Sequence, residues 1–229
     1  MFDIGHDRKS DLGGAGGRRE RHKRDKRLRI LRSARDLFSE KGFARTTIRE
    51  VATRADVGTG TLFSYARDKR DLLHQVFRAH IGGVQQTAFE TIPDTGTVQE
   101  KLMHVFRAFF ASYAENVPLA RDFMRERFHM ILDDSDGQPA SAAQTLAFLQ
   151  ALAALLEAAQ QAGELRDDFP PLLAASSIFA VYLLAVDTWL GSPLPMDRQM
   201  VEGLLADTIA LHIDGLRPRA RKVGTKSRQ

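Results

Sequence analysis

Residues 30–73 read ILRSARDLFSEKGFARTTIREVATRADVGTGTLFSYARDKRDLL, and this stretch determines the fold expected for the chain. Apolar side chains from Ile30 to Phe38 repeat with helical spacing, which predicts a helix over residues 21–41. Gly42 suits the end of that helix, because glycine adopts left-handed backbone angles at little steric cost. The stretch therefore predicts a series of short helices separated by tight breaks.

Two further helices are expected inside this stretch, joined by a short turn. Thr47 and Glu50 have the spacing of a capping box, which predicts that a second helix begins at Thr47. Residues 56–58 interrupt the pattern, and a third helix is expected over residues 59–66. The side chains expected in the core are Phe38, Val51, Leu62 and Phe63. Two short helices joined by a short turn are typical of the helix-turn-helix motif, whose second helix enters the major groove of DNA.

The N-terminal end of the third helix carries the residues expected to meet DNA. Glycine there permits a close approach of the backbone, and short hydroxyl side chains can donate and accept hydrogen bonds at base edges. Side chains further along the helix, and at the start of the next one, are expected to hold phosphates and so fix the register of binding. The residues concerned are Thr59, Gly60, Thr61, Ser64, Tyr65 and Lys69.

Over residues 30–73 the sequence resembles the TetR family of bacterial regulators. The matching positions are Phe38, Gly42-Phe43, Thr46-Thr47-Ile48, Val57, Gly60-Thr61-Leu62-Phe63, Tyr65, Lys69 and Leu72. The resemblance implies that Thr47 caps the second helix and contacts phosphate, and that Arg49 reaches a base edge or phosphate. It also implies that Lys69 holds phosphate from the start of the fourth helix. Phe63 and Ala66 depart from the family pattern, which more often has a tyrosine and a large aromatic residue there.

The rest of the chain also has helical patterns and no convincing strand alternation, so the expected fold is all-α with about nine helices. Glycine and proline residues separate the expected helices. Gly82-Gly83 and Pro93-Asp94 are expected to interrupt the helical pattern, which suggests a domain join at residues 80–96. The later helices are expected near residues 97–116, 119–133, 140–163, 169–191 and 197–216. The expected organisation is a disordered basic, glycine-rich arm (1–20), a DNA-binding domain (21–80), an effector-binding and dimerisation domain (81–216) and a basic tail (217–229).

Charge is divided unevenly along the chain, although the formal net charge is only +4. Residues 1–80 hold 20 Lys and Arg against 11 Asp and Glu, whereas residues 81–216 hold 7 against 18. A basic head on an acidic body is what a nucleic-acid contact confined to one end requires. The alternative interpretation is a basic terminus with no partner, and the helix-turn-helix pattern favours the DNA contact.

Aromatic residues are frequent in the acidic body, where by spacing alone most of them are ordinary core. The resemblance implies that the middle helices hold a small, usually apolar ligand, and that its binding moves the fourth helix and the DNA-binding heads. A pocket of that kind is mostly hydrophobic with a few polar groups. The ligand-binding residues expected on this basis are Phe106, Phe110, Arg127, Tyr182 and Trp189.

The last two expected helices have apolar faces and small residues, such as Ala174 to Ser177, that permit close packing. The resemblance implies that they form a homodimer. Its two recognition helices would read the half-sites of a palindromic operator, about one helical turn of DNA or a multiple of it apart.

Several classes of protein are disfavoured. The chain has no cysteine, which excludes disulfides and thiolate metal sites. It shows no phosphate loop, paired-histidine zinc motif or serine elbow, so we expect neither an enzyme, a cofactor nor a metal site. The apolar runs at residues 146–156 and 172–190 are interrupted by polar residues, which favours buried helices in a cytoplasmic protein over membrane spans. Two alternatives stay open: a regulator without a small-molecule effector, and an activator instead of a repressor.

Overall fold

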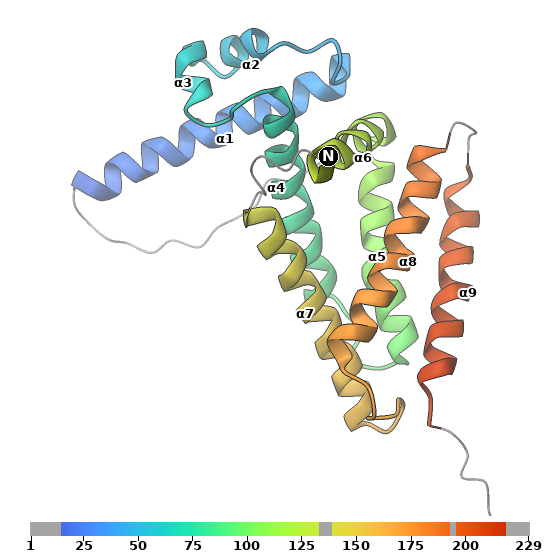
Figure 1. The fold of residues 1–229 in the computed structure, drawn as a ribbon. Coiled ribbons are helices and arrows are strands. Elements are labelled where there is room, and N and C mark those ends of the chain that lie inside the picture. Colours follow the sequence, from blue (N-terminus) through green and yellow to red (C-terminus); the bar gives the residue numbers. More distant parts are fainter. Residues whose placement is uncertain (1–14, 133–138, 193–195, 219–229) are drawn as a thin grey trace, which may run out of the picture.

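The computed structural model describes residues 15–132, 139–192 and 196–218, and these residues are helical with short connections. They form a small headpiece above a larger body, which confirms the all-α prediction (Figure 1). The helices are α1 (Ala15–Lys41), α2 (Ile48–Arg54), α3 (Thr59–Phe63), α4 (Lys69–Glu90), α5 (Val98–Ala114), α6 (Val117–Leu132), α7 (Pro139–Gln161), α8 (Pro171–Gly191) and α9 (Arg198–Leu216).

The headpiece consists of α1, α2, α3 and the first turns of α4. Gly42, with φ of 81°, follows the end of α1, and its N–H donates to the Phe38 carbonyl. Thr47 caps α2, and its capping box with Glu50 is formed as the spacing predicts. The side chains that fill this core include Ile30, Leu37, Phe38, Val51, Leu62 and Leu72. The core fixes the orientation of the short helix α3, which is too short to be stable alone.

One helix, α4, joins the headpiece to the body without a break. It begins after Asp68, whose side chain accepts a hydrogen bond from the Asp71 N–H, and continues for 22 residues. The expected interruption at Gly82-Gly83 is therefore wrong. A Cβ at position 82 would lie 3.3 Å from the Gln144 Nε2 atom of α7, so glycine there accommodates a neighbouring side chain.

The body packs α5 to α9 around an aromatic core. α8 lies between α7 and α9, and α5 contacts α4, α7 and α9. α7 (over Ala142–Gln161) and α8 are long and apolar enough to cross a membrane by length and composition, but both pack into this helical body. Large hydrophobic side chains stay exposed on their outer faces and on α9.

Three details of the headpiece differ from the sequence-based expectations. α1 begins at Ala15, so the part of the glycine-rich arm after residue 14 is helical. Once the buried half of α1 has formed, each added residue gains one backbone hydrogen bond, and the helix extends toward the N-terminus. α3 ends at Phe63, and Phe63 is 53% exposed and not part of the core. In this five-residue helix Leu62 occupies the inward face, so the adjacent Phe63 points outward.

Candidate functional site

The N-terminal end of α3 forms an exposed surface of small polar residues. Thr59, Gly60, Thr61 and Ser64 are all exposed, and Gly60 has open space where a Cβ would be. The Ser64 hydroxyl lies 3.5 Å from the Gly60 carbonyl, at the limit of a hydrogen bond. Tyr65 is half-buried and packs against the headpiece core. The structure thus brings the residues expected at base edges together on one exposed face.

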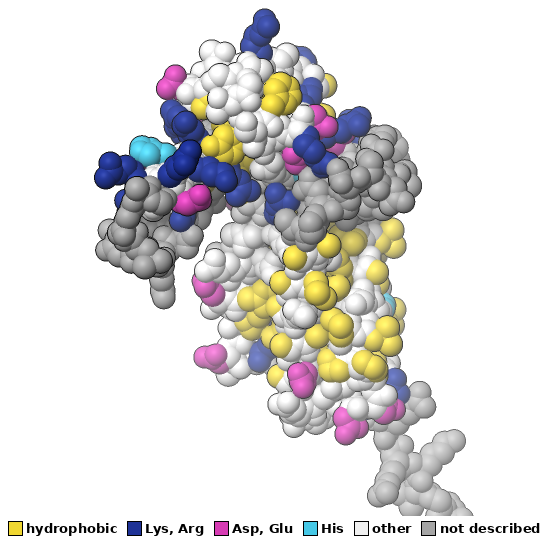
Figure 2. All heavy atoms as spheres, turned by 60° about the vertical axis from the view of Figure 1, so that its left-hand side comes forward, with side chains coloured by type: hydrophobic (Ala, Val, Ile, Leu, Met, Phe, Trp, Pro, Cys, Tyr) yellow, Lys and Arg dark blue, Asp and Glu magenta, His cyan; other side chains and the backbone are white. Residues whose placement is uncertain are grey.

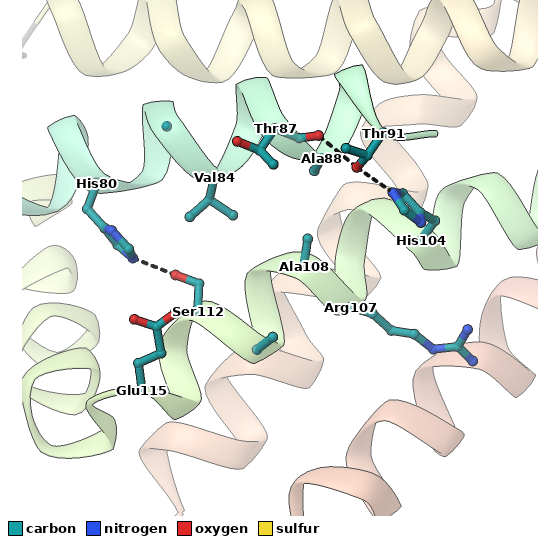
Figure 3. A pocket seen from close by; sticks show the side chains of 12 residues that line it. His80, Val84, Thr87, Ala88, Thr91, His104, Arg107, Ala108, Ser112 and Glu115 are labelled. Carbon is teal, nitrogen blue, oxygen red and sulfur yellow. Dashed lines mark hydrogen bonds between the residues drawn. The ribbon is translucent and has the colours of Figure 1, made fainter. Parts of the chain in front are cut away.

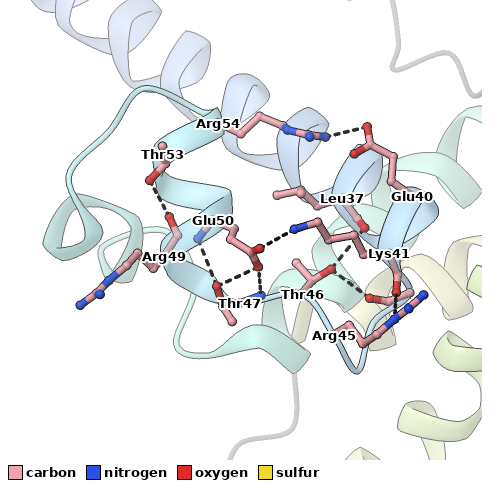
Figure 4. A network of polar contacts seen from close by, with 11 residues as sticks. Leu37, Glu40, Lys41, Arg45, Thr46, Thr47, Arg49, Glu50, Thr53 and Arg54 are labelled. Carbon is pink, nitrogen blue, oxygen red and sulfur yellow. Dashed lines mark hydrogen bonds and ion pairs between the residues drawn. The ribbon is translucent and has the colours of Figure 1, made fainter.

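A polar network fixes the start of α2 beside this face. The Thr47 N–H and hydroxyl each donate to Glu50 Oε2 at 2.9 Å, and Lys41 forms an ion pair with the same carboxylate (Figure 4). Hydrogen bonds from Lys41 and Thr47 lower the pKa of Glu50 to about 2. Arg49 points away from this network into solvent, where a phosphate or a base edge could meet it (Figure 4).

Lys69 has a structural role that the sequence did not suggest. Its Nζ donates to the carbonyl oxygens of Phe43 at 2.9 Å and Ala44 at 3.2 Å, and lies 4.5 Å from the centre of the Phe43 ring. These contacts tie the start of α4 to the loop between α1 and α2. The expected contact between Lys69 and DNA phosphate stays a prediction, and it would have to be made by an ammonium group already held in place.

Basic side chains surround the headpiece, whereas the visible face of the body is largely hydrophobic with scattered acidic groups (Figure 2). The charge division seen along the sequence is therefore also a division in space. A polyanion would be attracted to the end of the molecule that carries α3.

The aromatic residues expected to bind ligand pack against one another. Phe106 and Tyr182 stack with ring centres 4.6 Å apart, and Phe110 lies 5.5 Å from Trp189. All four side chains are at most 5% exposed. The side chain of Arg127, the fifth expected residue, lies outside the described part of the chain. The expected aromatic set is thus a close-packed seam between α5 and α8, and its contact with a ligand stays a prediction.

Hollow space lies instead between α4 and α5, as a groove of about 590 Å³ (Figure 3). Small side chains on the two helices, such as Ala88, Ala108 and Ala111, leave this space open. Thr91 Oγ1 lies 3.0 Å from His104 Nε2 near one end, and Arg107 and Glu115 lie about two helical turns apart along α5. The volume is within the range of small-molecule sites, and the lining mixes apolar and polar groups.

His80 closes the end of the groove nearest the headpiece. Its Nε2 atom lies within hydrogen-bond distance of the Ser112 hydroxyl, and both side chains are buried. Burial, helped by the positive charge of Arg35, lowers the pKa of His80 to about 4. A neutral imidazole therefore bridges α4 and α5 at neutral pH.

A clasp from α6 holds the body to the headpiece. The Phe43 N–H donates to Asp122 Oδ2 at 3.1 Å, and Arg70 pairs with Glu126 at 2.6 Å. Between these polar contacts, Phe123 stacks on Phe77 with ring centres 4.0 Å apart. α6 thus contacts both the loop before α2 and the first half of α4.

Sequence reasoning missed the exposed Phe63, the α4–α5 groove and the α6 clasp. The adjacent pair Leu62-Phe63 carried one usable signal, because two neighbours on a short helix cannot both face the same core. The groove and the clasp depend on how helices far apart in the sequence pack together, so no local sequence pattern predicts them.

Comparisons with known proteins agree with this architecture. The family described as "Bacterial regulatory proteins, tetR family" matches residues 30–76, and the family described as "MftR C-terminal domain" matches residues 100–216. The fatty acid metabolism regulator protein of Bacillus subtilis (strain 168) is 25% identical over 171 residues, which cover 74% of this chain and 86% of that protein. The regulator HbdR of Aromatoleum sp. (strain CIB) is 32% identical over 87 residues, 38% of each chain.

Two solved structures share the fold over most of their length. Thermus thermophilus FadR, a TetR-family repressor in complex with lauroyl-CoA, gives a TM-score of 0.67 at 24% identity and covers 86% of this chain and 97% of its own. Bacillus subtilis FadR in complex with stearoyl-CoA gives 0.64 at 23% identity, with coverage of 83% and 99%. At these identities the structures show a common fold. The similar proteins are regulators of transcription, and no enzyme family is indicated.

Proposed function

The chain belongs to the TetR family of DNA-binding transcriptional regulators, and on this premise we propose that it is a homodimeric repressor released from a palindromic operator by a small, largely apolar ligand. The observation that carries the proposal is the exposed face of α3, where Thr59, Gly60 and Thr61 stand on a rigid core at the basic end of the molecule. Such a helix end can reach base edges in the major groove.

The outer faces of α8 and α9 support a homodimer. Leu173, Leu184, Leu204 and Leu211 are each more than half exposed, and on α8 the exposed positions recur with helical spacing. Of the residues expected at the dimer contact, Ala174 and Ala175 instead lie in the core. An apolar face shared by two adjacent helices suits a two-fold interface, in which the same surface is used on both protomers. Burial of these faces in a dimer is also consistent with a cytoplasmic protein.

We propose that the ligand enters the groove between α4 and α5. A ligand there would contact α4 along Val84, Thr87 and Ala88, so it could change the angle between α4 and α5. Because α4 continues into the headpiece and is held there by Lys69, such a change would move the recognition helix. The ligand must bind the released conformation more tightly than the DNA-bound one, since only a difference in affinity shifts the equilibrium.

Acyl-CoA thioesters are the first ligands to test. Two similar structures hold lauroyl-CoA and stearoyl-CoA, and a relative from Bacillus subtilis is a regulator of fatty acid metabolism. In the groove, Arg107 offers a positive charge and His104 a hydrogen-bonding group beside the apolar lining from α4. The four aromatic residues of the expected ligand-binding set could take part if the seam that they form between α5 and α8 opens to admit an acyl chain.

The proposal is tested by selecting bound sequences from random duplex DNA with the purified protein, followed by titration with lauroyl-CoA and stearoyl-CoA. We expect an inverted repeat with half-sites about one helical turn apart, and release of the selected duplex by an acyl-CoA. A single unrepeated half-site would contradict the homodimer on DNA. Unchanged DNA affinity with every acyl-CoA would contradict this ligand class, and failure of a broader ligand library would favour a regulator without an effector.

Dimerisation has a separate test in solution. We expect Leu184→Glu, on the outer face of α8, to shift the protein toward a monomer in analytical ultracentrifugation. Leu146→Glu, on the exposed face of α7, is the matched control and should leave the mass unchanged. Equal behaviour of the two variants would contradict an interface formed by α8 and α9.

A further inference from the structure

We propose that the N-terminal part of α1, residues 18–29, is a second DNA-binding surface that holds phosphates flanking the base pairs read by α3. The inference rests on the proposed DNA-binding function and adds to it an element outside the region matched by the family, which begins at residue 30. This segment is called the α1 extension below. Figure 1 shows it projecting beyond the rest of the headpiece.

The composition of the α1 extension fits a polyanion. Its twelve residues include eight Lys and Arg and two acidic residues, and residues 18–27 contain no apolar side chain. At 100° per residue, the basic side chains point to every side of the helix. All residues from 18 to 27 are exposed, and Lys and Arg gather on this part of the surface (Figure 2).

The same composition argues against other partners. A helix that inserts into a membrane surface or docks in a protein groove needs an apolar face, and residues 18–27 offer none. Residues 18–27 also add nothing to the buried core, because their side chains are exposed. Their like charges three or four residues apart repel one another. Duplex DNA, with a phosphate charge about every 1.7 Å along its axis, would relieve that repulsion.

The α1 extension is joined rigidly to the recognition helix. It is continuous with the buried half of α1, which begins at Ile30 in the headpiece core. At its inner end, Arg29 lies 3.4 Å from Asp56, in the turn between α2 and α3. The extension therefore leaves the headpiece beside the helix-turn-helix itself. Its twelve residues span about 18 Å, or about five base pairs of duplex.

The experiment compares two full-length variants with the parent protein on two duplexes. One duplex carries the selected operator alone, and the other adds about eight base pairs on each side. The extension variant carries Arg18→Gln, Arg19→Gln and Lys26→Gln, which keep good helix formers in place. The control variant makes the same change of net charge on the body with Lys101→Gln, Arg198→Gln and Arg217→Gln. Affinity is measured by fluorescence anisotropy over a series of salt concentrations.

We expect the extension variant to bind the long duplex about tenfold or more weakly at low salt, with the salt slope shallower by about 0.9 for each phosphate that the variant no longer neutralises. On the short duplex it should match the parent, and the control variant should match the parent on both. Unchanged binding of the long duplex by the extension variant would overturn the inference and leave the proposed function standing. So would an equal weakening in the control variant or an equal weakening on the short duplex.

Two further outcomes separate the inference from its premise. A parent protein that selects no duplex at all would overturn the DNA-binding function and the inference with it. If the extension variant instead loses binding to phosphatidylserine vesicles while its affinity for the long duplex is unchanged, the surface binds membranes and the inference is wrong.

Discussion

The headpiece and the body are both built from helices around an apolar core, yet they keep their functional groups in opposite places. In the headpiece, small polar side chains on α3 face solvent, and the aromatic residues beneath them give support. In the body, the aromatic residues expected to bind ligand are themselves the core, and the open space lies where Ala88, Ala108 and Ala111 face each other. Aromatic richness therefore indicates packing, whereas a hollow forms where facing side chains are small.

The largest difference between the two regions is expected when one phenylalanine is truncated in each. Phe110→Ala, in the fully buried seam of the body, should lower the free energy of unfolding by about 3–5 kcal/mol, because less apolar surface is buried and a cavity remains. Phe63→Ala, on the exposed face of α3, should change it by less than about 0.5 kcal/mol. Denaturant unfolding measures both. A mild effect of Phe110→Ala, with loss of ligand binding, would mean that the seam is a pocket.

The pH dependence of stability tests the buried end of the groove. Because burial lowers the pKa of His80 from 6.5 to about 4, the unfolded chain takes up a proton first as pH falls. Stability should therefore be unaffected by this group above pH 6.5 and decrease below it, by about 2 kcal/mol at pH 5 and about 3 kcal/mol near pH 4.

The control for His80 is His80→Gln, which removes the titrating group. Between pH 6.5 and 4, the free energy of unfolding should depend less steeply on pH in the variant. The difference in slope should correspond to the uptake of about one proton. Some dependence should persist, because burial also lowers the pKa of His74. Identical slopes in the parent and the variant would show that His80 is solvated, and that the groove reaches it in solution.

Lys69 lies at the junction of the two regions, where a structural role and a DNA contact can be tested separately. Its ammonium group donates to two loop carbonyls, so Lys69→Ala should cost about 1–2 kcal/mol of stability. If Lys69 also contacts phosphate, the variant should bind all DNA sequences more weakly, with a shallower salt slope. Arg49→Ala, on the exposed side of α2, tests a DNA contact without this structural role. Loss of stability with unchanged DNA affinity would make Lys69 a purely structural residue.

The smallest effect is expected on α3, the proposed DNA-reading surface. Thr61→Ala should leave stability unchanged and alter the preference for one base pair of the operator by about 1 kcal/mol, because one hydroxyl no longer meets a base edge. Binding to a panel of single-base operator variants measures this preference. A uniform weakening over the whole panel would assign Thr61 to the phosphate backbone.

Sequence reasoning succeeded where a structural feature depends on residues that are close together in the sequence. The capping box of Thr47 and Glu50 and the glycine after α1 depend on residues a few positions apart, so their spacing was enough to place α2 and the end of α1. The low helix propensity of glycine predicts a break at Gly82-Gly83. The structure keeps the helix, since the position faces Gln144 of α7, a residue far away in the sequence.

The same distinction between local and long-range interactions applies to the candidate site. The exposed residues of α3 were predictable, because a motif with fixed spacing places them. The clasp of Asp122 on the Phe43 backbone joins residues 79 positions apart, and no periodicity encodes such a pairing. The groove is likewise a property of two facing helices, and only the packed structure reveals it.

The unbroken course of α4 has a mechanical consequence. Twenty-two residues make a rod about 33 Å long, with the groove at one end and the loop contacts of Lys69 at the other. Tilting such a rod by about 6° about its lower end displaces the upper end by about 3.4 Å, which is one base-pair step of DNA. In the proposed homodimer, a side-chain-sized adjustment between α4 and α5 would therefore be enough, by lever geometry alone, to put the two recognition helices out of register with their half-sites.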